Sequence, residues 1–178
     1  MSSNPLPFSI SQQECGEWCW AAVAVAIGAF YEDQDCPGRQ CELVNQILQL
    51  SKDCCTQCRC KTDPFDSCNQ PQNLADVLGQ YKHCRDDTSG IAEMEFADVQ
   101  KEIDDGHPIA VSITLDDPAA SGHAIVIYGY SQDGKVHIAD PMHIDTNITM
   151  AFDDLLAGTG SESHGKWQTG FRTKGRDE

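Results

Sequence analysis

The sequence predicts an α+β domain in which helices come first and an antiparallel sheet follows. Residues 18–31 are uncharged, free of proline and rich in alanine, which is typical of a buried helix. Helical patterns continue to about residue 105, and short β-branched runs begin at residue 109. The 178 residues are enough for one domain with a sizeable core. We therefore expect a single domain over residues 1–178.

The first half of the chain is expected to be helical. A run without charged residues has no face that prefers water, so residues 18–31 should be buried on nearly every side. Asn73 can cap a later helix, and Gly106 can end another. The expected helices span residues 18–31, 41–50, 74–81 and 95–105, and a cysteine-rich loop covers residues 51–71.

The second half of the chain has the pattern of strands. The Asp133-Gly134 pair between the second and third runs predicts a tight hairpin. The expected strands span residues 109–114, 124–130, 136–139, 147–150 and 167–173, and residues 155–164 are expected to form a loop. We place a helical lobe at about residues 13–90 and a β lobe at about residues 91–174, with the boundary near residues 88–92.

Ten cysteines are present, and eight of them lie between residues 36 and 84. Such crowding predicts disulfides in an oxidising compartment, a zinc site built from Cys54, Cys55, Cys58 and Cys60, or a set of reduced thiols. Disulfides are favoured, because Cys55 and Cys58 form a single C-x2-C clamp, whereas structural zinc sites usually pair two separated clamps. If Cys19 is reserved for chemistry, the other nine are an odd number, so at least one more thiol is unpaired within the chain.

The formal net charge of −16 comes from acidic residues spread along the chain. Such a surface repels phosphate backbones, so no nucleic acid is expected as a partner, whereas a basic protein or peptide fits. The sequence has no apolar stretch of membrane-spanning length and no basic-then-apolar export signal at its start. We expect no membrane association.

Cys19 is the candidate nucleophile. It stands at the start of the buried helix, six residues after Gln13. A helix N-terminus and a nearby imidazolium both depress the pKa of a thiol. The Gln13 amide and the Cys19 backbone N–H would then be placed to hold a developing oxyanion. The competing interpretation is an inert cysteine at the start of a buried helix.

His123 is the candidate base among the six histidines. It follows Gly122 and opens the second expected strand, so its imidazole should stand at the rim of the sheet. Asp140 ends the next strand of the hairpin, which brings it back beside the start of the first. We predict that Asp140 orients His123 as the third member of a catalytic group. The competing interpretation is that His123 only packs within the sheet.

These residues resemble those of the papain-like cysteine proteases. Gln13 and Cys19 match the family's spacing of glutamine and nucleophile, Cys19-Trp20-Ala21 matches its Cys-Trp-Ala, and residues 123–130 look like its histidine strand. A bacterial branch is more similar still, namely plant-pathogen effector proteases and the peptidase domains that trim bacteriocin leaders. That branch has an Asp-Pro like Asp140-Pro141 and a Gly-x-Pro like residues 106–108.

One departure concerns the segment before the nucleophile. The plant-type members have Cys-Gly-Ser-Cys there, whereas this chain has Cys15-Gly-Glu-Trp-Cys19, which is one residue longer. Cys15 looks structural in the family rather than catalytic. Gln12 competes with Gln13 for the oxyanion role, and the spacing favours Gln13.

The resemblance implies a papain-like fold, with the nucleophile on a long central helix of the helical lobe and the cleft between that lobe and the sheet. It also implies covalent acyl transfer, in which Cys19 and His123 rest as thiolate and imidazolium. Asp140 would fix the ring tautomer, and Gln13 would stabilise the oxyanion. The resemblance implies neither a metal nor another cofactor.

The expected activity is that of a cysteine endopeptidase acting on a protein or peptide substrate. We further expect a monomer, secreted as a bacterial effector or toxin through a dedicated machine, with an inhibitor or immunity protein as a further partner. A transglutaminase or deamidase acting on glutamine side chains would use the same residues. A cysteine-stapled binding module and a zinc-organised interaction protein are the alternatives without catalysis.

Overall fold

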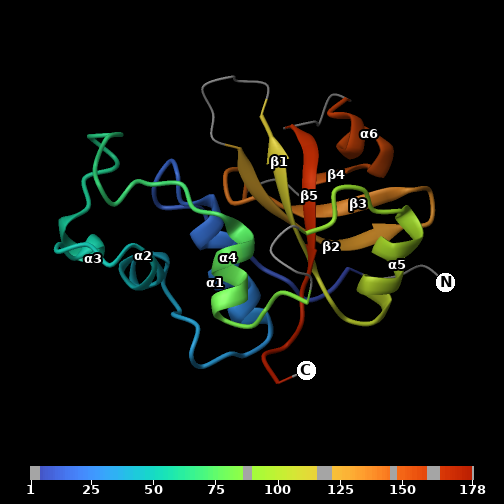
Figure 1. Cartoon of the computed structure of the whole chain (residues 1–178). Coiled ribbons are helices and arrows are strands. Elements are labelled where there is room, and N and C mark those ends of the chain that lie inside the picture. The colour runs from blue at the N-terminus through green and yellow to red at the C-terminus, as the bar shows by residue number, and fades with distance from the viewer. Residues whose placement is uncertain (1–4, 86–89, 116–121, 145–147, 160–164, 178) are drawn as a thin grey trace.

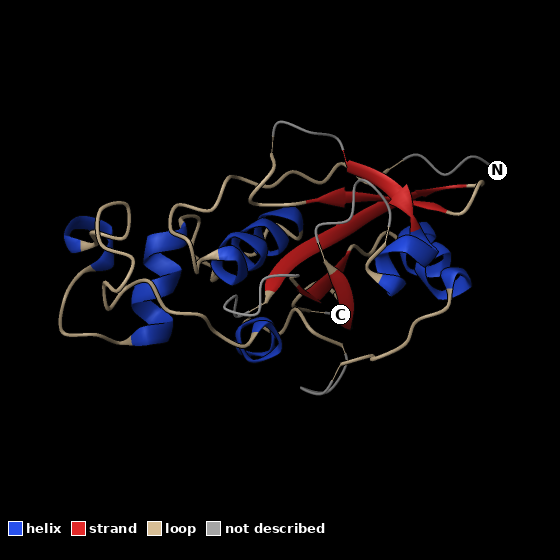
Figure 2. Cartoon of the chain, turned by 90° about the horizontal axis from the view of Figure 1, so that it is seen from above, coloured by secondary structure: helices blue, strands red, loops and turns tan. Residues whose placement is uncertain are grey.

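The fold is a five-stranded antiparallel sheet with helices against both of its faces (Figures 1 and 2). The computed structural model describes residues 5–85, 90–115, 122–144, 148–159 and 165–177. The predicted α+β class is confirmed. The expected boundary at residues 88–92 lies partly outside the described residues, and the division into two lobes stays a prediction.

All four expected helices are present, and two short ones are added. The helices are α1 (Cys19–Phe30), α2 (Gln40–Leu48), α3 (Cys54–Gln57), α4 (Leu74–Gln80), α5 (Phe96–Asp104) and α6 (Phe152–Ala157). Within the expected cysteine-rich loop, α3 forms because the Asp53 side chain accepts a hydrogen bond from the backbone N–H of Cys55. The loop expected over residues 155–164 was wrong at its start, where α6 continues until Gly158 ends it in the left-handed region. Residues 160–164 lie outside the described part.

The strands follow the expected runs. They are β1 (Ile109–Thr114), β2 (His123–Ser131), β3 (Lys135–Ala139), β4 (Ile148–Ala151) and β5 (Lys166–Arg172), arranged in the order β4-β3-β2-β1-β5 with every neighbouring pair antiparallel. The hairpin predicted from Asp133-Gly134 is confirmed and joins β2 to β3. Gly134 supplies the positive φ of 82° that its turn requires.

The two faces of the sheet contribute to two separate cores. Ala110 and Ala124 point toward α1, and their small side chains let that helix lie close to the sheet. Ile109, Val111 and Ile125 point to the opposite face, where α5 and α6 cover them. The alternation along β1 and β2 therefore makes the sheet the shared wall of both cores.

Helix α1 is the central post of the first core, as its composition predicted. Eight of its twelve residues are buried. It packs between the sheet and the other helices of the first half, with α2 and α3 farthest from the sheet (Figure 1). No helix in the described part of the chain is both long and apolar enough to cross a bilayer.

Three disulfides hold the cysteine-rich segment, which confirms the favoured interpretation of the crowded cysteines. They join Cys15 to Cys60, Cys41 to Cys55 and Cys54 to Cys68. Four cysteines are outside these bridges, namely Cys19, Cys36, Cys58 and Cys84. Of the four cysteines considered as zinc ligands, Cys54, Cys55 and Cys60 each belong to a different disulfide.

Candidate active site

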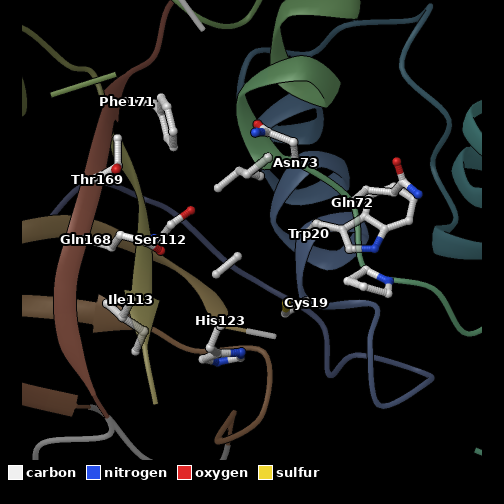
Figure 3. Close-up of a pocket in the computed structure, with 14 residues that line it drawn as sticks. Cys19, Trp20, Gln72, Asn73, Ser112, Ile113, His123, Gln168, Thr169 and Phe171 are labelled. Atoms are coloured by element: carbon white, nitrogen blue, oxygen red, sulfur yellow. The ribbon is translucent and has the colours of Figure 1, made fainter. Parts of the chain in front are cut away.

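A cleft of about 270 Å³ lies where the helices of the first half face the sheet. Cys19 and His123 stand beside each other at its base (Figure 3). Trp20 and Asn73 form the wall on the helical side, and Phe171 of β5 lies on the opposite wall. The cleft therefore brings together the two residues proposed as nucleophile and base, Cys19 from α1 and His123 from β2.

Cys19 is the first residue of α1. Among the described residues no side chain caps this helix, and its first turn holds no acidic residue. The uncompensated N–H groups of the first turn therefore direct their partial positive charge toward the Cys19 sulfur. Anionic groups are stabilised at such a helix end.

Two tryptophans fix the start of α1 against the cysteine-rich segment. The indole N–H of Trp18 donates to the carbonyl of Cys68 at 2.7 Å, and that of Trp20 donates to the carbonyl of Gln70 at 3.0 Å. Trp18 and Trp20 are each 1% exposed. Cys68 is itself held by its disulfide with Cys54. The two tryptophans beside Cys19 are therefore bound to a segment that is fixed in place.

His123 and Asp140 form a buried hydrogen-bonded pair. His123 opens β2, and Asp140 follows the last residue of β3, so the antiparallel pairing of β2 with β3 brings them together. The Nε2 of His123 lies 2.7 Å from Oδ1 of Asp140. An ionised carboxylate only accepts, so Nε2 carries the proton of this bond, and Nδ1 is the ring nitrogen left to serve the neighbouring Cys19.

The pair is electrostatically coupled to the thiol. Burial alone would lower the pKa of His123, but the hydrogen bonds and charges of Asp140 and Cys19 raise this pKa to about 9. Burial would raise the pKa of Asp140, but the hydrogen bond and charge of His123, with the N–H of Met142 and the His143 ring, lower it to about 2. At neutral pH the site therefore favours an imidazolium beside an ionised aspartate.

In the part of the chain that the structure describes, the side-chain hydrogen bonds of Gln13 go to its own loop and not to Cys19, His123 or Asp140. Its amide Nε2 donates to the carbonyl of Cys15 at 3.0 Å and to that of Gly16 at 2.7 Å, while its buried Oε1 has no partner among the described residues. It is not among the described residues that line the cleft. The backbone N–H of Gln13 donates to the carbonyl of Pro141 at 2.9 Å, which ties its segment to that of Asp140. The oxyanion role of Gln13 stays a prediction.

Several residues of the site could not be found from sequence patterns. The cleft walls include Ser112, Thr169 and Phe171, which come from β1 and β5. These strands are far apart in sequence and pair antiparallel in the sheet. Trp20 could be predicted as part of the site, because it directly follows Cys19 in the sequence. His143, which contacts Asp140, carried no periodic signal.

The comparisons with known proteins identify a family and a fold. The chain matches the model of the Peptidase_C39 like family over residues 5–168. A solved structure with a similar fold is the peptidase domain of Streptococcus ComA, a bi-functional ABC transporter involved in a quorum sensing pathway. Its TM-score is 0.55 at 14% sequence identity, and the alignment covers 93% of this chain and 96% of that one. No curated protein matches.

At this identity the ComA domain shows the fold alone, whereas the family match spans most of the chain. The fold, in which α1 faces an antiparallel sheet, is the one expected from the papain-like resemblance. The structure also brings together Cys19, His123 and Asp140, and their catalytic roles stay a prediction. The chain belongs to the Peptidase_C39 like family and is a papain-like cysteine peptidase.

Proposed function

We propose that this chain is an endopeptidase that cleaves a protein substrate through an acyl-enzyme on Cys19. The observation that supports this most is the buried His123, whose Nε2 lies 2.7 Å from Oδ1 of Asp140 and whose ring stands beside Cys19 in the cleft. This arrangement supplies both a charged partner for a thiolate and a proton donor for a leaving amine.

The proposed reaction has two halves. The Cys19 thiolate attacks the substrate carbonyl carbon, and the carbonyl π electrons move to oxygen to form an oxyanion. His123 then gives its proton to the amine as the C–N bond breaks, which leaves a thioester on Cys19. A water molecule, deprotonated by His123, attacks the thioester, and the acid product leaves as the thiolate re-forms.

Substitution of Cys19 by alanine tests the nucleophile. We expect Cys19→Ala to abolish cleavage of a peptide library while the wild type yields pairs of products that together have gained one water. Cys84→Ala is the matched control, because Cys84 is also outside the disulfides but does not line the cleft. Mass spectrometry separates hydrolysis from deamidation or cross-linking of glutamine side chains. Substantial cleavage by Cys19→Ala would remove Cys19 from its role.

Gln13→Ala tests the proposed oxyanion donor. Its Nε2 already donates to two carbonyls of its own loop, so one of these bonds must be exchanged for the oxyanion during catalysis. We expect Gln13→Ala to lower kcat by roughly 10²–10³-fold with little change in KM, as for loss of one oxyanion donor. Gln12→Ala is the control, and a larger loss in that variant would transfer the role to Gln12.

The described lining of the cleft supports a substrate with neutral side chains near the cleaved bond. Apart from His123, the described lining has no ionisable side chain other than Cys19, and it alternates apolar surfaces with amides and hydroxyls such as Asn73 and Thr169. The strongly acidic composition favours basic residues in the parts of the substrate that lie outside the cleft.

The biological role that we propose is that of a secreted bacterial effector or toxin. The three disulfides support it, since such bridges persist in oxidising compartments. Fractionation of the producing cells with an antibody against the chain tests the proposal. Detection in the medium or in a recipient cell would support secretion, and retention of all the protein in the producer's cytoplasm would refute it.

A further inference from the structure

Asp140 contacts a second histidine besides His123, and we propose that this histidine, His143, is a positioning residue of the active site. Its Nδ1 lies 3.1 Å from Oδ2 of Asp140, the carboxylate oxygen opposite to the one that binds His123. The proposal rests on the proposed function, because the orientation of His123 matters for turnover only if His123 acts on Cys19.

The direction of the proton in this contact follows from the chemistry of the carboxylate. Asp140 is ionised across the neutral range, so it can only accept, and the Nδ1 of His143 must carry the hydrogen. Oδ1 accepts from His123 and also from the backbone N–H of Met142, at 2.7 Å each. The carboxylate is thus held at both oxygens, which restrains its rotation about χ2.

His143 reaches this buried carboxylate from the surface. Its side chain is 41% exposed, whereas that of Asp140 is 1% exposed. The ring borders a hollow of about 200 Å³ together with Tyr128 of β2, and Asp140 and Tyr128 are the titratable groups that face it among the described residues. Loss of the ring therefore removes a donor from Oδ2 without opening a core.

The turn that carries His143 is also connected to the Gln13 segment. The backbone N–H of His143 donates to the carbonyl of Asp140 at 3.1 Å, which closes the turn. Within this turn, the carbonyl of Pro141 accepts from the N–H of Gln13. The His143 ring therefore fixes a turn in which Asp140 supports His123 and the carbonyl of Pro141 holds the backbone of Gln13.

Two effects should follow from loss of the ring. The carboxylate gains rotational freedom, so His123 is less well oriented and kcat falls about tenfold, the lower end of the effect of one hydrogen bond to a charged group. The carboxylate also keeps more of its charge for His123, so the pKa of His123 rises. Asp140→Asn would shift the same pKa in the opposite direction.

The test compares His143→Ala and His143→Gln with the wild type. The glutamine amide can donate to Oδ2, so we expect His143→Gln to recover most of the kcat that His143→Ala loses, with KM unchanged in both. ¹⁵N NMR titration of the His123 ring should show a higher pKa in His143→Ala than in the wild type. Urea unfolding of both variants checks that the fold is retained.

The proposal is overturned if His143→Ala leaves both kcat and the His123 titration unchanged, or if only KM moves. It is also overturned if His143→Gln is as slow as His143→Ala. The NMR titration needs no turnover, so it decides the role of His143 even if the chain cleaves no peptide, and an absence of cleavage is a failure of the proposed function alone.

Three sulfur atoms converge beside the loop that precedes Cys19, and we infer that Cys15 can form a disulfide with either of two partners. Cys15 is bonded to Cys60, and the Sγ of Cys58 lies 3.6 Å from the Sγ of Cys15. All three sulfurs lie within 4.8 Å of one another. Cys58 is only partly buried, so it can exchange its proton with solvent.

The exchange requires no external oxidant. The Cys58 thiol loses its proton to solvent, and its thiolate forms a bond to the Cys15 sulfur. The Cys15–Cys60 bond breaks with its electron pair on Cys60, which takes up a proton. The carbonyl of Cys15 accepts from the Gln13 amide, so the choice of partner acts on the loop that holds the proposed oxyanion donor.

Disulfide mapping under non-reducing, acid-quenched conditions tests this site. In Cys60→Ser we expect a Cys15–Cys58 bridge, and in Cys58→Ser a Cys15–Cys60 bridge. Wild type equilibrated in a glutathione buffer should contain both forms, and Cys84→Ser should match the wild type. Alkylation of both Cys15 and Cys58 in Cys60→Ser, with only the Cys15–Cys60 bridge in the wild type, would overturn the inference. The inference would also be overturned if metal analysis found one zinc ion per chain, bound by the thiols of Cys15, Cys58 and Cys60.

Discussion

The carboxylate of Asp140 accepts hydrogen bonds from His123, His143 and the backbone of Met142. Each donor favours the ionised form, and together they lower the pKa of Asp140 to about 2 against the opposing effect of burial. The negative charge is therefore present throughout the neutral range of pH. This charge, together with the hydrogen bond to Asp140, contributes to the raised pKa of His123.

The pH dependence of activity should report this charge. Burial lowers the pKa of His123, but Asp140 and Cys19 raise it to about 9, so the imidazolium is retained below that pH and lost above it. We expect kcat/KM to fall as the pH rises through about 9. In Asp140→Asn the supporting charge is gone and burial dominates, so the alkaline limb should move to lower pH. An alkaline limb at the same pH in both proteins would contradict the coupling.

Cys36, like Cys19, is outside the disulfides, but its surroundings are different. Cys36 is buried, and desolvation with the nearby Asp33 raises its pKa to about 12. Its sulfur packs against α1, near the carbonyl of Ala24. Cys36 is thus an example of the inert buried cysteine that competed with the catalytic interpretation of Cys19.

At the scale of the element, α1 depends on close contact with the segment that follows it. A Cβ added at Gly28 would lie 2.5 Å from the Sγ of Cys36, closer than real contacts allow. Alanine gains about 1 kcal/mol over glycine in a helix, whereas overpacking a core costs about 1–3 kcal/mol. The close approach of residues 28 and 36 therefore requires glycine.

We expect Gly28→Ala to lower the free energy of unfolding by up to about 2 kcal/mol, since the overpacking outweighs the gain in helix propensity. Gly79→Ala is the matched control, because Gly79 is exposed in α4 and nothing lies within 4 Å of an added Cβ there. That variant should be stabilised by up to about 1 kcal/mol. Urea unfolding measures both, and a stabilised Gly28→Ala would show that Cys36 can move aside.

Local patterns predicted the elements that depend on local chemistry. The uncharged run of α1 and the Asp133-Gly134 turn each contain their own signal, and the β2–β3 hairpin was enough to bring His123 beside Asp140. The position of β5 next to β1 could not be predicted in this way, because their pairing joins residues about sixty positions apart. The cleft wall at Phe171 and the pairing of the cysteines depend on the same kind of distant contact.

For the whole molecule, the formal net charge of −16 is the dominant long-range property. Like charges on a compact chain repel one another, and unfolding relieves that repulsion. Salt screens it, since the Debye length shortens from about 30 Å at 0.01 M to about 8 Å at 0.15 M.

We therefore expect the urea midpoint of unfolding to rise as sodium chloride is increased over this range. Urea is the appropriate denaturant because it is uncharged, whereas guanidinium chloride would itself screen the charges. Potassium chloride should have the same effect, which distinguishes screening from binding of one ion. A midpoint that is constant or falls with salt would show that local ion pairs outweigh the net repulsion.

The sheet is the common wall of two cores, because β1 and β2 send alternate side chains to α1 and to α5 and α6. If either core unfolds, the sheet that forms one wall of the other core is exposed to water. The strand that begins at His123 and the helix that begins at Cys19 are therefore parts of one cooperative unit. We therefore expect the geometry of the site and global stability to be lost together on heating, in a single transition.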